Sequence, residues 1–199
     1  MSIWRRVLLG AAGGALLMSM AGAAAAEDTS ALKPPAGAKV AIIAFEDLQC
    51  SDCADAEPLL QEAVKKYGVP LVRHDFSLPQ HNWSFEAHVL ARYFDTLSPA
   101  LGEQFRHWIF TIQTSIRREN LRGMAERFAD QHRVVLPEEI DPDGKLAALV
   151  KADFALGQAA GVQKTPTVWV VSQTERSEPF IEQVDRDALF ALIEQMRKD

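Results

Sequence analysis

Two cysteines separated by two residues are the groups in this sequence best suited to covalent chemistry. Cys50-Ser51-Asp52-Cys53 follows an apolar run at residues 40–45 and begins a segment, residues 50–67, whose apolar side chains recur at helical spacing. Cysteines three positions apart in the first turn of a helix lie on one face and are close enough to form a disulfide. Unpaired backbone N–H groups and the helix dipole favour a negative charge there, which lowers the pKa of the first thiol. We therefore predict that Cys50 is the attacking thiolate and that Cys53, one turn deeper, resolves the mixed disulfide.

Two other roles for the cysteine pair stay open. A structural disulfide between positions so close in sequence closes almost no loop and would stabilise the fold little, and strained local disulfides are usually the labile ones. The alternative function is a metal-binding protein without redox turnover, for instance a copper carrier, with further ligands from His74, His81 and His88. Zinc or copper would want three or four ligands, and the sequence has no third cysteine.

The two ends of the chain carry strand patterns, and the middle carries helix patterns. Short apolar or alternating runs predict strands at residues 40–45, 69–78, 167–171 and 180–184. Helical spacing predicts helices at residues 50–67, 83–97, 101–116, 121–132 and 144–160, and a last helix capped by Asp185. Strands at the two ends need each other to form one sheet. The helices between about residues 80 and 160 are therefore predicted to be an insertion.

Two prolines extend the pattern around the cysteines. Pro58 falls inside an otherwise good helix, where proline costs stability. Pro166 begins a predicted strand after a turn, so Thr165–Pro166 is a candidate cis peptide bond. Cys50-x-x-Cys53, Pro58 and Thr165-Pro166, in this order, resemble the thioredoxin fold. Residues 73–79 (RHDFSLP) and 153–167 narrow the resemblance to the DsbA-like branch of the thioredoxin superfamily, from about residue 40 to the C-terminus.

This resemblance implies the fold class and the activity. The expected fold is α/β, a thioredoxin fold with a helical insertion between the second and third core strands, in a domain spanning residues 40–199. The expected activity is that of a DsbA-like thiol:disulfide oxidoreductase, which exchanges a Cys50–Cys53 disulfide with the thiols of substrate proteins. The redox-active Cys50–Cys53 disulfide would be the reactive group, and no other cofactor is expected. A membrane redox partner could reoxidise the cysteines after each turnover. By resemblance, Thr165 would bind substrate backbone as an added strand and Pro166 would lie against the cysteines.

The sequence departs from the DsbA-like pattern around the cysteines. Ser51 and Asp52 stand where relatives often have His or Pro, and Ala44 stands where an acid is common, with Glu46 and Asp47 nearby on different positions. A carboxylate at position 52 disfavours a neighbouring thiolate and so the reduced protein. We therefore predict a redox potential more negative than the about −120 mV of DsbA and nearer the about −270 mV of thioredoxin.

The first 26 residues have the layout of a secretory signal peptide. Arg5 and Arg6 precede an apolar stretch at residues 7–20, and small residues at 23–26 precede the acidic Glu27. We expect cleavage after Ala26 and export, for instance to the periplasm, with residues 27–39 as an extended lead-in. A retained membrane anchor is the alternative, but the apolar stretch is short and rich in glycine.

The charge of the chain argues against a nucleic-acid partner. Removing residues 1–26, which hold two arginines and no acid, would change the formal net charge from −6 to −8. Binding to nucleic acid would require a basic face. Substrate proteins with cysteines are therefore the expected partners, and the sequence leaves the oligomeric state open.

Overall fold

The computed structural model describes residues 32–198, which form one four-stranded sheet with helices around it. In chain order the elements are β1 (Val40–Glu46), α1 (Ser51–Tyr67), β2 (Leu71–Asp75), α2 (Ser84–Leu97), α3 (Pro99–Ile112), the short 3₁₀ turn η1 (Gln113–Ser115), α4 (Leu121–His132), α5 (Lys145–Ala159), β3 (Thr167–Ser172), β4 (Phe180–Ile181) and α6 (Arg186–Met196). The predicted α/β class is confirmed, and α2 to α5 all lie between the second and third strands. The predicted signal peptide and residues 27–31 of the lead-in lie outside the described residues.

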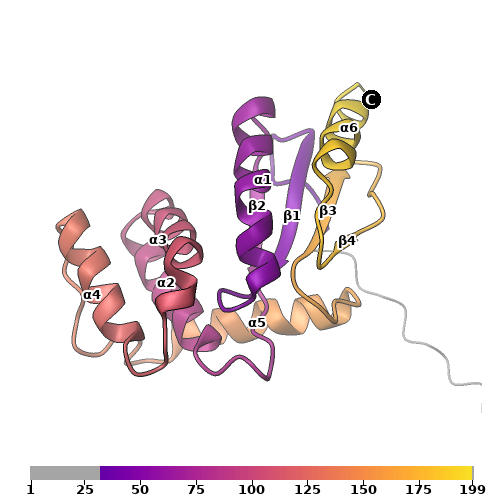
Figure 1. Cartoon of the computed structure of the whole chain (residues 1–199). Helices are drawn as coiled ribbons and strands as arrows, with labels where there is room; N and C mark the ends of the chain where they lie inside the picture. The colour runs from indigo at the N-terminus through magenta and orange to yellow at the C-terminus, as the bar shows by residue number, and fades with distance from the viewer. Residues whose placement is uncertain (1–31, 199) are drawn as a thin grey trace, which may run out of the picture.

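The central strand of the sheet is β1. The strand order is β2-β1-β3-β4, with β1 parallel to β2 and antiparallel to β3. Every residue of β1 is buried, as a continuous apolar run predicts for a strand covered on both faces. Alternate side chains point to opposite faces. Ile42 therefore packs in a core with α1 and α6, whereas Ile43 packs in a second core on the face where α5 lies (Figure 1).

The inserted helices build a third core of their own beside α1. Its buried members include Trp83, Phe94, Phe105 and Phe128, and the rings of Phe94 and Phe105 lie 4.6 Å apart. The same cluster includes Cys50 and Cys53. Figure 1 shows α2, α3 and α4 standing together on one side of α1, with α5 returning to the start of β3. The insertion is therefore packed against the end of α1 that carries the cysteines.

Three predicted boundaries are wrong for identifiable reasons. The second strand, predicted at 69–78, is limited to Leu71–Asp75. The last strand, predicted at 180–184, ends at Ile181 because Glu182 adopts a left-handed conformation with φ 63°, which does not continue a strand. The helix predicted from 101 begins at Pro99, because proline suits a first helical turn and the side chain of Ser98 caps it at Leu101 N–H over 3.1 Å.

The predicted cap of the last helix is confirmed. The side chain of Asp185 caps α6, accepting a hydrogen bond from Ala188 N–H at 2.7 Å. Gly68 ends α1 in a left-handed conformation that glycine adopts without strain. Within residues 32–198, no helix has the length and the apolar composition that crossing a bilayer requires.

Candidate redox-active site

Helix α1 begins at the cysteine pair. Cys50 is the residue before the first turn, with extended backbone angles (φ −78°, ψ 126°), and its carbonyl accepts a hydrogen bond from Ala54 N–H at 3.2 Å. Pro58 lies inside the helix, as the sequence predicts. The start of the helix thus directs backbone N–H groups toward the sulfur of Cys50.

The surroundings of Cys50 favour its thiolate. The hydrogen bond with the Cys53 side chain lowers the pKa of Cys50 most, burial opposes it, and Thr165 and the backbone N–H groups of Cys53 and Asp52 lower it further, from the ordinary 9.0 to about 6. These contacts therefore favour the thiolate of Cys50, which is the nucleophilic form of cysteine.

The surroundings of Cys53 favour its thiol. Cys53 is 0% exposed, against 7% for Cys50, so Cys53 is the deeper of the two, as the sequence predicts. Burial raises the pKa of Cys53 well above its ordinary value, and the hydrogen bond with Cys50 and the charge of Glu46 raise it further. Both cysteines are free thiols in this structure. The pair thus combines one sulfur that favours the thiolate with a neighbour that favours the thiol.

The loop before β3 closes over the sulfur of Cys50. The Thr165–Pro166 bond is cis, as predicted, and the Cys50 thiol donates a hydrogen bond to the carbonyl oxygen of Thr165 at 3.2 Å. The Thr165 hydroxyl is buried and has no hydrogen-bond partner among the residues that the structure describes. Once Cys50 ionises, this hydroxyl is an available donor, which agrees with its lowering of the Cys50 pKa.

The insertion contacts the backbone of the site through one amide side chain. Gln113, in the turn η1 after α3, donates from Nε2 to the carbonyl oxygens of Leu48 and Cys50, at 3.0 and 2.9 Å. On the other side of the loop, the Gln49 side chain accepts a hydrogen bond from Trp83 N–H at 2.9 Å. The segment that leads into the cysteines is therefore held by the residue before α2 and by the turn after α3. Gln113 could not be predicted from the sequence, because nothing in its local pattern distinguishes it from a solvent-exposed glutamine.

A buried acid lies beneath Cys53. Glu46, the last residue of β1, is 3% exposed and pairs with the buried Arg73 of β2. Its other oxygen, Oε1, has no hydrogen-bond partner within residues 32–198. Burial raises the pKa of Glu46, Arg73 lowers it, and Glu57 raises it again, with a net increase. The neighbouring Asp47 is fully buried but well bonded, and its backbone N–H donates to the Cys53 sulfur at 3.4 Å.

Arg73 is shared among three acids. Besides Glu46, it contacts Glu57 of α1 at 2.7 Å and Glu103 of α3 at 2.9 Å. Glu57 also contacts His107, at 3.1 Å, on the exposed side of α3. We call Arg73, Glu46, Glu57 and Glu103 the acid-rich cluster. The sequence marks Arg73 only as part of the RHDFSLP segment; its position beneath the cysteines depends on the pairing of β1 with β2.

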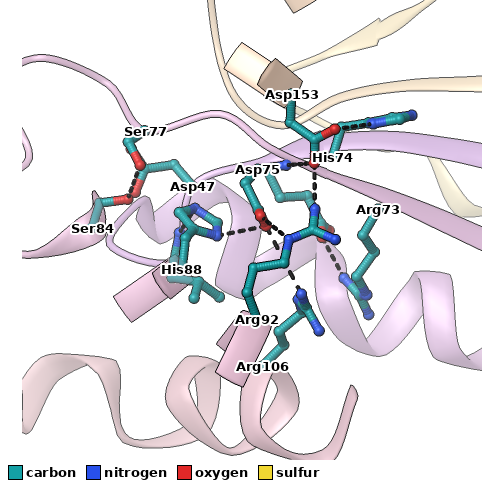
Figure 2. A network of polar contacts seen from close by, with 12 residues as sticks. Asp47, Arg73, His74, Asp75, Ser77, Ser84, His88, Arg92, Arg106 and Asp153 are labelled. Atoms are coloured by element: carbon teal, nitrogen blue, oxygen red, sulfur yellow. Dashed lines mark hydrogen bonds and ion pairs between the residues drawn. The ribbon is translucent and has the colours of Figure 1, made fainter. Parts of the chain in front are cut away.

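A second charged cluster joins the insertion to the sheet, and Figure 2 shows it. Asp75 of β2 contacts His88 and Arg92 of α2, with Arg106 of α3 at 4.0 Å, and Arg92 also pairs with Asp153 of α5. Burial would raise the pKa of Asp75, but the surrounding basic groups, His88 first, outweigh it and hold the pKa below its ordinary range. We call this group the balanced cluster; its further members are His74 and Asp95.

The residues between the cysteines are open to solvent. Ser51 is exposed and Asp52 is half-buried. The Asp52 backbone N–H contributes to the low pKa of Cys50. The effect of the Asp52 carboxylate on the redox potential stays a prediction.

The three histidines of the metal-binding alternative do not assemble. His74, His81 and His88 contact three different carboxylates, those of Asp153, Asp47 and Asp75. In the part of the chain that the structure describes, no three or more His, Cys, Asp or Glu side chains gather in a way that could hold a metal ion. Within the described residues, these histidines therefore do not form a set of metal ligands with the cysteines.

A thioredoxin-like sheet, a cysteine pair at the start of its first helix and a cis-proline against the first sulfur define a protein of the thioredoxin class. A family model described as Thioredoxin matches residues 35–193, and the chain belongs to this family. A search of curated proteins gives no match.

Solved structures of DsbA type share the fold. The Wolbachia pipientis α-DsbA1 structure is similar with a TM-score of 0.69 and 16% identity, covering 83% of this chain and 89% of that one. A periplasmic thioredoxin-like protein from Salmonella enterica serovar Typhimurium has a TM-score of 0.65 and 17% identity, covering 83% and 88%. Proteus mirabilis ScsC has a TM-score of 0.63 and 18% identity, covering 83% and 72%. At these identities the similarity establishes a DsbA-like fold, as the sequence predicts.

Proposed function

We propose that the protein is an exported thiol–disulfide oxidoreductase that exchanges a Cys50–Cys53 disulfide with the thiols of substrate proteins. The observation that carries the proposal is the placement of the two sulfurs: Cys50 lies at the start of α1 with its Sγ 3.2 Å from the Thr165 carbonyl oxygen, and Cys53 is fully buried. The two cysteine pKa values shift in opposite directions as a result. The pKa of Cys50 is lowered to about 6, whereas that of Cys53 is raised. A structural disulfide would need no such difference, whereas an attacking and a resolving cysteine require it.

The exchange proceeds through a mixed disulfide. In the oxidising direction, a substrate thiolate attacks the Cys50 sulfur of the disulfide, and Cys53 leaves as a thiolate and takes up a proton. A second substrate thiolate then attacks the substrate sulfur of the mixed disulfide, and Cys50 leaves as a thiolate. The substrate dithiol is thereby oxidised and the protein disulfide reduced, with two electrons transferred. The low pKa of Cys50 makes it the better leaving group in the second step.

The loop before β3 is the proposed substrate contact. Thr165 and Pro166 border the Cys50 sulfur, and both are buried in the free protein. Extended substrate backbone pairing with this loop would bring a substrate sulfur to Cys50. The redox-active disulfide is the proposed reactive group, with no separate cofactor.

Export and recycling belong to the same proposal. The basic, apolar and small-residue order of residues 1–26 supports a signal peptide. The similar Salmonella protein is described as periplasmic, and an oxidising compartment is where a disulfide can be kept formed. A membrane redox partner would then restore the disulfide after each turnover.

The test is disulfide transfer to an unfolded substrate. The oxidised protein, lacking residues 1–26, is mixed with a reduced, unfolded protein, and substrate disulfides are counted by mass spectrometry after acid quenching. We expect transfer by the wild type and none by Cys50→Ser. Cys53→Ser should accumulate a mixed disulfide when a substrate disulfide is supplied. Absence of any exchange between wild type and thiols, glutathione included, would refute the proposal.

A further inference from the structure

The four residues that lead into the cysteine pair form a tight turn. Cys50 N–H donates to the Asp47 carbonyl oxygen at 3.0 Å, and Gln49 N–H donates to the Asp47 side chain at 2.7 Å. The N–H of Asp47 itself donates to the Cys53 sulfur at 3.4 Å. We call residues 47–50 the cysteine turn. Its first residue thus contacts the resolving cysteine through its backbone and holds the turn through its side chain.

The carboxylate of Asp47 gathers three hydrogen-bond donors. This side chain is 0% exposed. Its Oδ1 accepts from Gln49 N–H, and its Oδ2 accepts from Leu78 N–H at 2.6 Å and contacts His81 Nδ1 at 2.8 Å. A carboxylate only accepts hydrogen bonds, so the Nδ1 atom of His81 must carry the proton in this contact. Charge-assisted hydrogen bonds of this kind are strong, and three of them fix the position of Asp47.

His81 is the donor that a substitution can remove. Gln49 and Leu78 donate to Asp47 through their backbone N–H groups, whereas His81 donates through its side chain. His81 lies in the loop between β2 and α2, and its side chain is 21% exposed. A change at position 81 therefore takes one donor from the buried carboxylate without removing a core side chain.

The sulfur of Cys53 carries negative charge in both directions of the exchange. It is a thiolate when it attacks the mixed disulfide at Cys50, and it is a thiolate when it leaves the Cys50–Cys53 disulfide. Burial raises the pKa of Cys53, and Cys50 and Glu46 raise it further, whereas the Asp47 N–H lowers it. A hydrogen bond to the charged form of a group favours that form. The Asp47 N–H thus stabilises charge on a sulfur whose burial disfavours it.

We propose that Asp47 and His81 are positioning residues for the resolving cysteine, which hold the cysteine turn so that the Asp47 N–H donates to the Cys53 sulfur while that sulfur is a thiolate. The proposal rests on the proposed exchange activity and assigns two further residues to it. Both side chains act through the backbone of residue 47 rather than on a sulfur.

The experiment separates the step at Cys50 from the step at Cys53. Reduced protein is mixed with excess oxidised glutathione at neutral pH. The Cys50 thiolate attacks a glutathione sulfur, which forms the mixed disulfide and releases one glutathione thiolate. Cys53 then gives its proton to solvent and attacks the Cys50 sulfur, which forms the protein disulfide and releases the second glutathione thiolate. Acid quenching at a series of times, followed by mass spectrometry, measures the rates of the two steps.

Loss of the His81 donor should slow the second step and leave the first unchanged. We expect the pKa of Cys53 to rise by about one unit, so its thiolate fraction falls about tenfold while its nucleophilicity rises about threefold. Resolution of the mixed disulfide should therefore be about threefold slower in His81→Ala and in His81→Gln. His81→Gln keeps the test decisive if His81→Ala does not fold.

His81→Asn is the matched rescue variant. The amide nitrogen of asparagine lies as many bonds from Cβ as Nδ1 of histidine, whereas that of glutamine lies one bond further. We therefore expect His81→Asn to resolve the mixed disulfide at nearly the wild-type rate. A variant that only loosened the loop would lose stability without this difference between asparagine and glutamine.

His74→Ala controls for the loss of a histidine–carboxylate contact as such. His74 Nδ1 contacts Asp153 at 2.9 Å, and its side chain is 14% exposed, similar to His81. Asp153 also contacts the N–H of Asp75 and the side chain of Arg92, which lie outside the cysteine turn. This variant should leave both rates unchanged.

The outcomes separate this proposal from the proposed function. Unchanged resolution in His81→Ala and His81→Gln, or equal slowing of both steps, would overturn the positioning role and leave the redox activity standing. Slow resolution in His81→Asn, matching that of His81→Gln, would also overturn it. Failure of the wild type to form any mixed disulfide with glutathione would instead refute the redox activity.

Discussion

Glu46 and Asp75 are register partners on adjacent strands, yet their surroundings differ. Both are almost fully buried, at 3% and 1% exposure. The pKa of Glu46 is raised and that of Asp75 is lowered. Burial raises the pKa in both cases, so it cannot account for the opposite signs.

The charges within reach explain the difference. In the acid-rich cluster Arg73, the basic partner of Glu46, is shared with Glu57 and Glu103. The further basic contacts of this cluster are His107 with Glu57 and, at 4.0 Å, Arg106 with Glu103. In the balanced cluster, by contrast, Asp75, Asp95 and Asp153 meet Arg92 and Arg106 together with two histidines. The balanced cluster lies where α2, α3 and α5 meet the sheet, so we interpret it as structural. The acid-rich cluster lies beneath Cys53, where an excess of negative charge disfavours the Cys53 thiolate.

The largest expected effect comes from removing the central acid of the balanced cluster. Asp75→Asn leaves Arg92 and Arg106 partly buried without their shared carboxylate, so we expect a loss of about 3–5 kcal/mol in the free energy of unfolding. The measurement is urea denaturation at neutral pH. Asp95→Asn, at a more exposed position, is the matched control and should cost less. Equal small losses in both variants would contradict the interpretation of this cluster as structural.

Removing the charge of Glu46, in contrast to that of Asp75, should stabilise the protein relative to wild type as the pH rises. A carboxyl whose folded pKa is raised contributes stability that is full below its unfolded pKa and is lost as the pH rises through the folded pKa. Relative to wild type, Glu46→Gln should therefore gain stability as the pH rises from acidic to neutral, and it should lower the pKa of Cys53. Urea denaturation at a series of pH values checks the first effect. The partly exposed Glu103, changed to Gln, is the control. If Glu46→Gln instead loses stability relative to wild type as the pH rises, the proposed difference between Glu46 and Asp75 would be contradicted.

Thr165→Val tests the charge balance at the other sulfur. The variant keeps the carbonyl that contacts Cys50 but removes the buried hydroxyl. We expect the pKa of Cys50 to rise by about one unit, because a hydrogen bond to a charged group contributes roughly 1.5–3 kcal/mol and solvent can replace part of it. The pH dependence of alkylation in a Cys53→Ala background measures this. An unchanged pH profile of alkylation would show that the Thr165 hydroxyl does not lower the pKa of Cys50.

The smallest expected effect is that of Asp52→His. The half-buried position is open to water, so the electrostatic contribution should be about 1 kcal/mol or less, which corresponds to about 20 mV for this two-electron couple. The variant should have the higher redox potential and the lower Cys50 pKa. Equilibration of both proteins with glutathione buffers measures the difference. A wild type as oxidising as DsbA would show that another group sets the potential.

The wild-type pKa of Cys50 agrees with a moderate potential. Its value of about 6 lies between the about 3.5 of DsbA and the about 7 of thioredoxin. A less stabilised thiolate means a less stabilised reduced form, so we predict that the disulfide is a weaker oxidant than that of DsbA.

The sequence predicts features that depend on residues close in the chain, and it does not predict contacts that depend on how distant segments pack. The cysteine motif, the cis Thr165–Pro166 bond and the cap at Asp185 depend on residues close in the chain, and the structure contains all three. The acid-rich cluster could not be predicted, because Arg73 and Glu46 come together through a parallel strand pair and Glu103 comes from the insertion. Gln113 was missed for the same reason, since its partners are more than sixty positions away.

The most direct test of the account is the pH dependence of limited alkylation of the reduced wild-type protein, with mass spectrometry to identify the labelled cysteine. The account predicts that the first adduct forms on Cys50 and that its rate is half-maximal near pH 6, because the pKa of Cys50 is about 6 whereas that of Cys53 is raised. Preferential labelling of Cys53, or a Cys50 rate that rises only near the ordinary thiol pKa of 9.0, would contradict it.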